Sequence, residues 1–360
     1  MCLCLVSAFS FKAKCISARS CVVICGETGE VIYGENENFR MPMASTTKIM
    51  TGLLLCEYGN LDREIVTTKE MVTVEGSSMG LLEGDTVSLK ALLYGLLLAS
   101  GNDAANTIAI IVGGSVENFV NMMNERAEKL GLEDTHFETP SGLDGDTHYT
   151  TCYELSLIAR EAMKNEEFAK AVSTESIRLA YGNPPYSRTI TNHNRLLKTY
   201  DDVVGVKTGF TKKSGRCLVS AARRDGKFVI AVTLNAPDDW RDHRYLLDLG
   251  LEAVELVDIK PKSDKISIPV ISGEDEYIES YISGRKLCVK RDSKVECKVN
   301  IKPYIIAPVK KGEVLGEVSY LVNDVKIFSD KIKSEKDIKC KKATKIQAFL
   351  DILKFTVSFL

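Results

Sequence analysis

The spacing of apolar residues changes along the chain. Up to about residue 255, long apolar segments with helical periodicity predict helices, and two segments of alternating residues predict β-hairpins. The predicted helices cover 47–59, 87–99, 102–114 and 115–130, and the predicted hairpins cover 20–35 and 217–236. Helices combined with antiparallel hairpins are typical of a domain of the α/β (α+β) class, here over 20–255.

From residue 256 the pattern becomes one of short alternating segments separated by Gly, Asp and Asn. Examples are ISIPVIS, KLCVKR, VECKVNI and EVSYLV. Because alternation places apolar side chains on one face of a strand, these segments predict a small all-β domain over 256–338. A chain of 360 residues is long enough for two such domains.

The first residues have the character of an export signal. Residues 2–11, CLCLVSAFSF, form an apolar stretch of suitable length, and Ala8 and Ser10 suit the small-residue rule for cleavage. The charged segment that normally precedes such a stretch is missing. We therefore interpret 1–19 as a truncated export signal, with a short buried strand as the alternative.

The last residues, 339–360, predict an amphipathic helix. After the lysines of KCKKATK, apolar residues recur every three or four positions from Ile346 to Leu360. Fifteen residues give about 22 Å of helix, which is shorter than a bilayer core of about 30 Å. Asp351 and Lys354 in the middle also disfavour spanning. A helix lying in the membrane interface fits better, and a helix docked on the protein's own core is the alternative.

Composition excludes several classes of protein. The net charge of −2 provides no general basic field, so nucleic-acid binding is not expected. No apolar run reaches the length of a spanning helix. The 11 cysteines include no C-x-x-C pair, and the 4 histidines stand apart from them, so no metal site is predicted. Most of the cysteines are interpreted as small buried apolar residues.

Candidate chemistry begins at Ser45-Thr46-Thr47-Lys48. Three residues make almost one helical turn, so the Ser45 hydroxyl and the Lys48 amine face the same way. A serine needs a base to become a nucleophile, and a desolvated lysine can be that base. The spacing alone is a weak signal, because a helix cap would look the same and because it recurs at Ser283-Gly-Arg-Lys286.

Two further tripeptides strengthen the case. Ser100-Gly101-Asn102 interrupts a long apolar stretch, which would be costly unless its polar side chains were used. Lys207-Thr208-Gly209 precedes the second hairpin and is predicted on an edge strand. There, Lys and Thr could bind an anionic substrate terminus and Gly would let a substrate backbone approach. In the order S-x-x-K, S-x-N, K-T-G, the three match the motif set of penicillin-binding proteins and class A β-lactamases.

Four longer segments resemble blocks of the D-alanyl-D-alanine carboxypeptidases, the low-molecular-mass penicillin-binding proteins. They are MPMASTTKIMTGLLLCE, GSSMGLLEGDTVSLKALLYGLLLASGNDAAN, THFETPSGLDGDTHYTTCYELSLIAR and VGVKTGFTKKSGRCLVSA. The resemblance is strong over 20–255 and weaker beyond. It implies a helical subdomain on a five-stranded antiparallel sheet, export, and anchoring at the outer face of the cytoplasmic membrane. It also implies peptidoglycan stem peptides as substrates and β-lactam antibiotics as covalent inhibitors, without a cofactor.

The resemblance also implies roles for residues at the matching positions. Ser45 would attack the carbonyl of the penultimate D-Ala and form an acyl-enzyme, with Lys48 as the base. Ser100 would relay a proton to the leaving D-Ala. The backbone N–H groups of Ser45 and Phe210 would hold the oxyanion.

Five positions are implied in substrate binding. Asn102 would bind an amide carbonyl of the substrate. Lys207 and Thr208 would hold its terminal carboxylate, beside Gly209. Phe210 would tune the choice of substrate.

Three different functions stay open beside this one. A class A β-lactamase adds a glutamate that activates the deacylating water, but the corresponding region reads THFETPSG, and Glu117 follows Ser100 by only 17 residues. The second is a D-Ala endopeptidase that cuts cross-links, and the third is an inactive protein that binds wall peptides.

Histidine catalysis is not expected, because no histidine lies in a nucleophile elbow. His136, His148, His193 and His243 are interpreted as structural or surface residues. Arg241 and Arg244, near the end of the first domain, are candidates for positions near the cleft.

Overall fold

The computed structural model describes residues 16–341, which form two compact units. Of the described chain, the first unit contains the residues up to Ile24, Val31–Arg224 and Val229–Leu251. The second contains Cys25–Glu30, Asp225–Phe228 and the chain from Glu252 onward.

The first unit is built on the five-stranded antiparallel sheet that was predicted. Its strands, in the spatial order β2-β1-β9-β8-β7, are β2 (Val31–Glu35), β1 (Ser20–Cys25), β9 (Lys227–Leu234), β8 (Gly215–Arg224) and β7 (Val203–Thr211). Both predicted hairpins are present. Since β7 is the last strand, Lys207 lies on an edge strand as expected, and the open side of that strand can accept a peptide.

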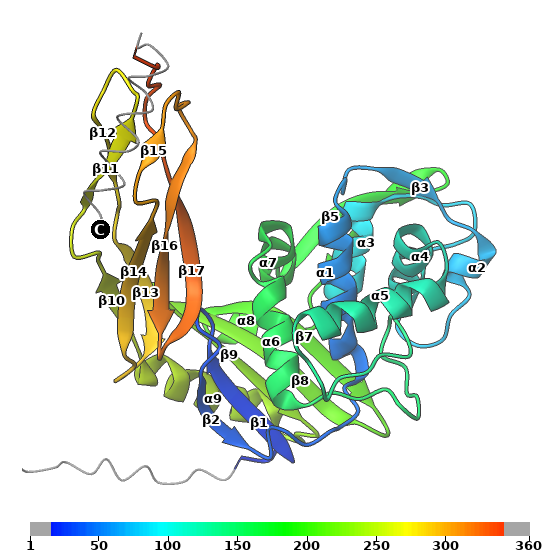
Figure 1. Cartoon of the computed structure of the whole chain (residues 1–360). Coiled ribbons are helices and arrows are strands. Elements are labelled where there is room, and N and C mark those ends of the chain that lie inside the picture. The colour runs from blue at the N-terminus through cyan, green and yellow to red at the C-terminus, as the bar shows by residue number, and fades with distance from the viewer. Residues whose placement is uncertain (1–15, 342–360) are drawn as a thin grey trace, which may run out of the picture. The chain divides into compact units, whose positions relative to one another are not determined.

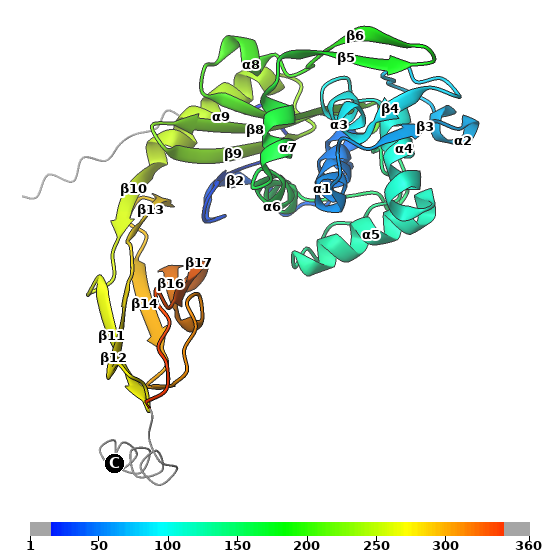
Figure 2. The same cartoon turned by 90° about the horizontal axis from the view of Figure 1, so that it is seen from above.

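Helices supply the rest of the first unit, and Figures 1 and 2 show α1, α3, α4 and α5 gathered together beside the sheet. The helices are α1 (Lys48–Tyr58), α2 (Lys69–Val72), α3 (Leu89–Leu97), α4 (Asn102–Gly113), α5 (Val116–Lys129), α6 (Cys152–Ala162), α7 (Glu166–Ser173), α8 (Leu196–Thr199) and α9 (Asp239–Ala253). The mixed α/β class is therefore confirmed.

Polar caps fix where several of these helices begin. Ser88, Ser115 and Thr151 each accept a hydrogen bond from the backbone N–H three residues later, at the start of α3, α5 and α6. The predicted helix over 87–99 is shorter than expected at its start, because Thr86–Ser88 form strand β4 and Ser88 then caps α3.

Close packing places α1 at the centre of the helices. Its residues from Lys48 to Leu55 are buried. A Cβ added at Gly52 would lie 3.0 Å from the ring of Phe168 in α7, so the missing side chain permits the close approach of the two helices. On the sheet, Gly250 of α9 similarly packs against Val23 and Val229.

A second, smaller sheet in the first unit was not predicted. Its order is β3 (Glu64–Val66), β4 (Thr86–Ser88), β5 (Ser176–Gly182) and β6 (Pro185–Thr191). Two of these strands have only three residues, too short for an alternating pattern to be recognised.

The second unit consists of strands, in agreement with the alternating pattern of its sequence. They are β10 (Val254–Ile259), β11 (Lys265–Ile271), β12 (Tyr277–Tyr281), β13 (Arg285–Lys290), β14 (Val295–Ile301), β15 (Ile305–Ile306), β16 (Val314–Val322) and β17 (Val325–Lys333). They pair as β10-β13, β12-β11-β15 and β14-β16-β17. Isolated bridges from Ile338 to Val309 and from Cys340 to Gly273 follow.

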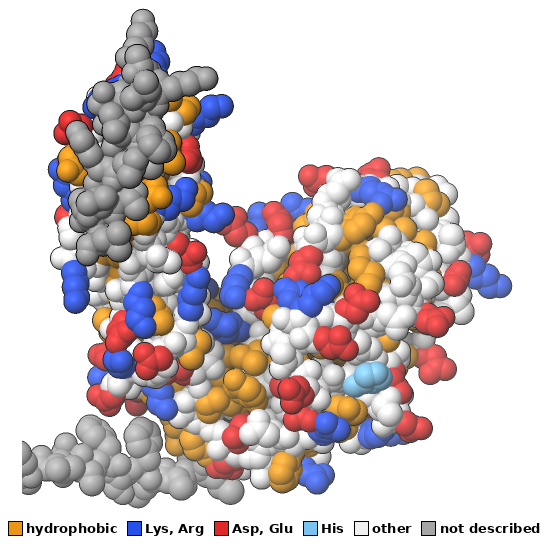
Figure 3. Space-filling view, viewed as in Figure 1, with side chains coloured by type: hydrophobic (Ala, Val, Ile, Leu, Met, Phe, Trp, Pro, Cys, Tyr) orange, Lys and Arg blue, Asp and Glu red, His pale blue; other side chains and the backbone are white. Residues whose placement is uncertain are grey.

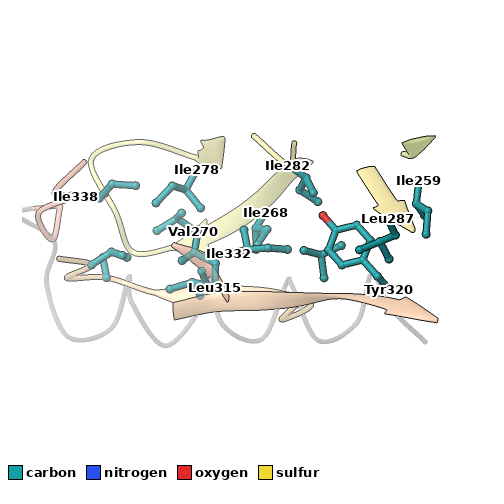
Figure 4. Close-up of a cluster of buried hydrophobic side chains, with 14 of the residues drawn as sticks. Ile259, Ile268, Val270, Ile278, Ile282, Leu287, Leu315, Tyr320, Ile332 and Ile338 are labelled. Carbon is teal, nitrogen blue, oxygen red and sulfur yellow. The ribbon is translucent and has the colours of Figure 1, made fainter. Parts of the chain in front are cut away.

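One apolar cluster joins the three small sheets of the second unit (Figure 4). Ile268 and Val270 of β11, Leu287 of β13 and Tyr320 of β16 are at most 8% exposed. Burying one such side chain contributes about 1.5–3 kcal/mol. The hydroxyl of Tyr320 donates to the carbonyl of Ser283 at 2.9 Å, so the ring is buried without leaving its polar atom unpaired.

Two sequence predictions lie outside the described residues, the export signal in its first fifteen positions and the amphipathic helix from residue 342. Between residues 16 and 341 no helix combines the length and the apolar character needed to cross a bilayer. Acidic and basic side chains are intermixed over the face shown in Figure 3, in keeping with the small net charge.

Candidate active site

Ser45 lies in a 3₁₀ turn, η1 (Ala44–Thr47), directly before α1. The preceding residue, Ala44, has φ of +48°, a left-handed conformation that is costly for a residue with a side chain. The turn is secured by side chains: the Thr46 hydroxyl donates to Met43 O at 2.6 Å, and the Thr47 hydroxyl donates to Ala44 O at 2.8 Å. A strained but secured turn of this kind holds the Ser45 hydroxyl in one place.

Lys48 is completely buried beneath Ser45. Its Nζ lies 3.0 Å from Ser45 Oγ, 2.7 Å from Asn102 Oδ1 and 2.7 Å from the Ser141 carbonyl oxygen. Burial lowers the pKa of Lys48 well below its ordinary value, and the positive charge of Lys207 lowers that pKa further, while Asp103 acts in the opposite direction.

These three contacts suit a neutral amine. A neutral lysine has two N–H donors and one lone pair, and here Asn102 Oδ1 and Ser141 O are acceptors only. With both N–H groups so used, the lone pair faces the Ser45 hydroxyl. The arrangement can remove the proton from that hydroxyl as it attacks a carbonyl.

Ser100 and Asn102 lie at the junction of α3 and α4. Ser100 has φ of +59° and is 5% exposed, so the sequence break seen between the two helices is a second strained position beside Ser45 in the same cleft. Asn102 is also 5% exposed, and its Nδ2 donates to Glu75 O, so its side-chain amide has partners at both ends.

The third motif lies on β7. Lys207 is 1% exposed, its Nζ donates to Thr208 O at 2.9 Å, and burial lowers its pKa to about 7. A Cβ added at Gly209 would lie 3.1 Å from the backbone nitrogen atoms of Ser45 and Thr46. The absence of a side chain at Gly209 therefore lets β7 pack against the turn that carries the nucleophile.

The three motifs meet in one cleft of about 330 Å³. Its walls are formed by Ser45, Ser77, Ser100, His193, Arg195, Thr208, Gly209, Phe210, Arg216, Asp239 and Trp240. Lys48, Asn102 and Lys207 lie behind this surface and are buried. All eight residues predicted for the site are thus brought together. A larger hollow of about 580 Å³ in the second unit is bordered by β12, β16 and β17, and the motif residues lie outside it.

Asp103 supports the wall that contains Ser77, a role that no pattern in the sequence indicated. Its carboxylate accepts hydrogen bonds from the backbone N–H groups of Met79, Gly80 and Leu81 and from the Ser78 hydroxyl, at 2.6–3.0 Å. Asp103 is 1% exposed. Asn102 N, the adjacent group, donates to Ser77 O at 2.7 Å. The loop 75–81 is therefore attached to the start of α4.

The histidines lie in structural or surface positions, and His193 is the one that reaches the cleft. His148 is buried against the Thr47 hydroxyl at 2.8 Å, and burial lowers its pKa to about 4, so it is neutral. Burial also lowers the pKa of His243, to about 3. His193 is exposed in the wall of the cleft, in agreement with its interpretation as a structural or surface residue. The segment that follows β6 brings His193 to the cleft, a placement that the sequence did not predict.

The end of the first unit contributes different residues from those expected. Arg241 pairs with Asp238, and Arg244 donates to Thr199 O. The cleft instead contains Trp240 and Arg216, whose guanidinium is 5.5 Å from the Trp240 ring centre. Helical periodicity explains the difference, since Trp240 and Arg241 are neighbours in sequence and point to different sides of α9.

Two motif-like features are excluded from the site. Glu117 is exposed in the first turn of α5 and is not among the residues that line the cleft, so it does not provide the glutamate of a class A β-lactamase. Ser283 and Lys286 belong to the second unit, where Lys286 of β13 lies opposite Asp258 in the register of the β10–β13 pair. Residues 16–341 also contain no cluster of three or more metal-binding side chains.

A serine next to a desolvated lysine, in a cleft between helices and the edge of an antiparallel sheet, is typical of a serine hydrolase. The sequence model for D-alanyl-D-alanine carboxypeptidases matches residues 7–238, and the chain belongs to that family.

Known proteins agree with this assignment. The D-alanyl-D-alanine carboxypeptidase DacF of Bacillus subtilis is 31% identical over 355 residues, 94% of this chain and 89% of the relative. Penicillin-binding protein 5 of Haemophilus influenzae has a TM-score of 0.66 at 25% identity, covering 91% of this chain and 99% of that one. The Streptomyces K15 DD-transpeptidase has a TM-score of 0.64 at 33% identity, covering 66% of this chain and 98% of that one. The predicted family and the serine-type carboxypeptidase activity are confirmed.

Proposed function

We propose that the chain removes the terminal D-Ala from peptidoglycan stem pentapeptides through an acyl-enzyme on Ser45. The observation that carries this proposal is the 3.0 Å contact between Lys48 Nζ and Ser45 Oγ, with the other two partners of Nζ both acceptors. Such a base is poised before the substrate arrives, and general-base assistance of this kind contributes about 10²–10⁴-fold to a rate.

Acylation begins when Lys48 takes the Ser45 proton and Oγ attacks the carbonyl carbon of the penultimate D-Ala. Charge develops on the carbonyl oxygen, which the backbone N–H groups of Ser45 and Phe210 stabilise, a contribution often worth about 3 kcal/mol per donor. Ser100 relays the proton held by Lys48 to the amine of the departing D-Ala, which returns Lys48 to its neutral form. Water then attacks the ester carbon and gives a proton to Lys48, which passes it to Ser45 Oγ as the ester bond breaks. The shortened peptide leaves with Ser45 restored.

The substrate is held by the third motif and by Asn102. The edge of β7 offers backbone groups to a peptide in extended conformation, and Gly209 leaves room for it. Thr208 and the positive charge of Lys207 attract the terminal carboxylate. Asn102 binds an amide carbonyl of the peptide through Nδ2, which exchanges its contact with Glu75 O for the substrate. Phe210, 65% exposed at the rim, contacts the variable part of the substrate.

β-Lactam antibiotics react at the same serine, because their strained amide presents a carbonyl and a carboxylate to the same groups. The acyl-enzyme that forms is slow to hydrolyse when the leaving group stays attached. A persistent adduct of one drug mass on Ser45 is therefore expected.

Two assays test the proposal together. Intact mass is followed after incubation with benzylpenicillin, and release of D-Ala is followed from a peptide ending in D-Ala-D-Ala, with the same peptide ending in D-Ala-L-Ala as control. We expect one adduct and release from the first peptide alone. Rapid loss of drug with unmodified protein would indicate a β-lactamase instead, and folded protein with neither activity would indicate a wall-peptide-binding protein. Cleavage of cross-linked dimers faster than of pentapeptides would indicate an endopeptidase.

Location at the membrane surface is the second part of the proposal. The lysine-rich segment 339–345 followed by the apolar stripe of 346–360 suits a helix lying in the interface of an anionic bilayer, on the outer face of the membrane after export. Vesicles with and without anionic lipid test it by co-sedimentation. The full chain should sediment with anionic vesicles, and a chain ending at residue 341 should not. Equal sedimentation of both chains would refute the anchor.

A further inference from the structure

Two cysteines far apart in sequence meet inside the second unit. Cys25, at the end of β1, and Cys288, on β13, are separated by 263 residues, and their Sγ atoms lie 4.0 Å apart. Cys25 Sγ is also 3.2 Å from the Cys288 carbonyl oxygen. Both side chains are completely buried, and both are thiols. The proposed activity does not use either.

The contacts around Cys288 direct its side chain toward Cys25. The backbone N–H of Cys288 donates to Glu27 Oε2 at 2.7 Å, and β13 is paired with β10, where Leu256 lies opposite. The backbone N–H of Phe228 donates to Cys288 Sγ at 3.4 Å. The sulfur is thus held between Phe228 and Cys25.

The surroundings of Cys25 favour a thiolate. Its backbone N–H donates to Glu30 O at 2.9 Å, and its carbonyl accepts from Gly29 N at 2.8 Å, which closes a tight turn. The Cys288 thiol lowers the pKa of Cys25 most strongly, and burial opposes this effect. The Thr28 side chain and the turn's backbone N–H groups add to the lowering, so the pKa of Cys25 lies below its ordinary value. A thiolate, not a thiol, is the nucleophile in disulfide exchange.

Cys21, four residues earlier on the same strand, shows what burial does without such partners. It is also completely buried, but burial raises its pKa to about 12. Cys21 fits the interpretation of these cysteines as small apolar residues, and Cys25 does not. The difference between them comes from the polar groups directed at the Cys25 sulfur.

We propose that Cys25 and Cys288 are a disulfide-forming pair that reacts with a small disulfide such as oxidised glutathione. A disulfide requires the two sulfur atoms to approach to about 2.0 Å, which rotation of the two side chains from a 4.0 Å separation can provide. The bond would link the β1 turn to β13 within the second unit.

The exchange takes place in two balanced steps. The Cys25 thiolate attacks one sulfur of the small disulfide, forms a mixed disulfide and releases one thiolate. Cys288 then loses its proton to that thiolate and attacks the Cys25 sulfur, which releases the second thiolate. Two protein thiols are oxidised by two electrons, and one small disulfide is reduced to two thiols. The hydrogen bond with Cys25, burial and the charge of Cys25 together raise the pKa of Cys288. The first and the last of these causes are lost once Cys25 is in the mixed disulfide, which assists the second step.

Oxidative refolding of the full chain tests the proposal, since folding gives the reagent access before the pair is buried. The denatured, reduced chain is refolded in a mixture of reduced and oxidised glutathione, remaining thiols are blocked in denaturant, and the chain is digested with trypsin. Cleavage after Arg19, Arg40, Lys286 and Lys290 gives the peptides Ser20–Arg40 and Leu287–Lys290. We expect these peptides joined by a disulfide in the folded protein, and separated after reduction.

Three variants assign the bond. Cys25→Ser and Cys288→Ser should lose the joined peptides, and Cys21→Ser, the matched control in the same peptide, should keep them. Circular dichroism establishes that each variant is folded. Joined peptides that persist in folded Cys25→Ser would place the bond at Cys21 and overturn the proposal. Folded wild-type protein with both cysteines blocked, or with glutathione still on Cys25, would also overturn it.

Discussion

The Nζ atom of Lys48 lies 2.7 Å from Oδ1 of Asn102, so the second motif of the site directly contacts the base of the first. This contact places Asn102 beside the amine, in addition to its proposed role in substrate binding. The Asn102 oxygen accepts one N–H of the amine. The lone pair of a neutral Lys48 can then face the Ser45 hydroxyl. The charge state of Lys48 therefore depends on the chemical type of residue 102.

Asn102→Asp should disable the base at neutral pH. A carboxylate at the same distance would stabilise the ammonium form and raise the pKa of Lys48. We expect the rate of acylation by benzylpenicillin to fall by about 10²–10³-fold at pH 7, in the range of a lost general base. Relative to wild type at the same pH, the rate should recover as the pH is raised. Stopped-flow measurement across pH checks this. Asn102→Ala, which adds no charge, serves as control, and an equal loss at every pH in both variants would contradict the explanation.

Ser45→Ala should abolish both the drug adduct and D-Ala release. Removal of a catalytic serine costs about 10⁶-fold in kcat in enzymes where it has been measured. The second S-x-x-K of the chain offers a matched control, because Ser283→Ala removes the serine of the same motif in the second unit. That variant should retain the full rate of acylation. An adduct on Ser45→Ala, located by peptide mapping, would move the nucleophile elsewhere.

The pH profile of kcat/KM should have two limbs. Activity rises as Lys48 loses its proton, at a pH well below the ordinary lysine pKa. Activity falls again as Lys207, whose pKa in the free enzyme is about 7, loses the charge that attracts the substrate carboxylate. In Lys207→Arg the charge is permanent, so the falling limb should disappear while some activity remains. A falling limb unchanged in that variant would assign it to another group.

The same lysines make stability depend on pH. Both have a lower pKa in the folded chain than in the unfolded one, where 10.5 is the ordinary value. Between about pH 7 and 10.5 the unfolded chain therefore binds more protons, and the free energy of unfolding should rise with pH across this window. Urea unfolding at several pH values measures this rise. In Lys207→Met the slope should be smaller, and an unchanged slope would show that Lys207 is not the source.

Asp103→Asn should loosen the loop that contains Ser77. The amide has one acceptor atom where the carboxylate has two, and a lost hydrogen bond to a charged group costs about 1.5–3 kcal/mol. We expect lower stability to urea and a slower acylation rate. Ser78→Ala, which removes one of the four loop contacts, is the milder control. If the rate of acylation by the folded Asp103→Asn variant equals that of wild type, the loop is not needed for the reaction.

The sequence predicted well which motif residues meet in the cleft, and poorly which residues support them. Ser45, Lys48, Ser100 and Lys207 were recognised because motif spacing and apolar surroundings are local properties. The residues that hold Lys48 and the loop 75–81 were not recognised. Ser141 accepts a hydrogen bond from Lys48, and Asp103 accepts one from Met79, and each pair is distant in sequence. The five-stranded sheet was expected from its hairpins and the family resemblance, but the small sheet was not.

The cleft residues His193 and Trp240 illustrate the same limit. Each stands between two polar residues, and only the direction of the backbone decides which side chains face the cleft. The direction at Trp240 follows from the rotation of α9, which begins one residue earlier at Asp239. Helical rotation can be read from sequence only when the first residue of the helix is known.

Gly142, in the segment that follows α5, packs closely against the turn that contains Ser45. A Cβ at this position, where φ is +85°, would lie 1.9 Å from Ala44 O, the carbonyl that accepts the Thr47 hydroxyl. A side chain at residue 142 would therefore displace the carbonyl that secures the turn of Ser45. The geometry of that turn thus constrains a residue on a segment far away in sequence.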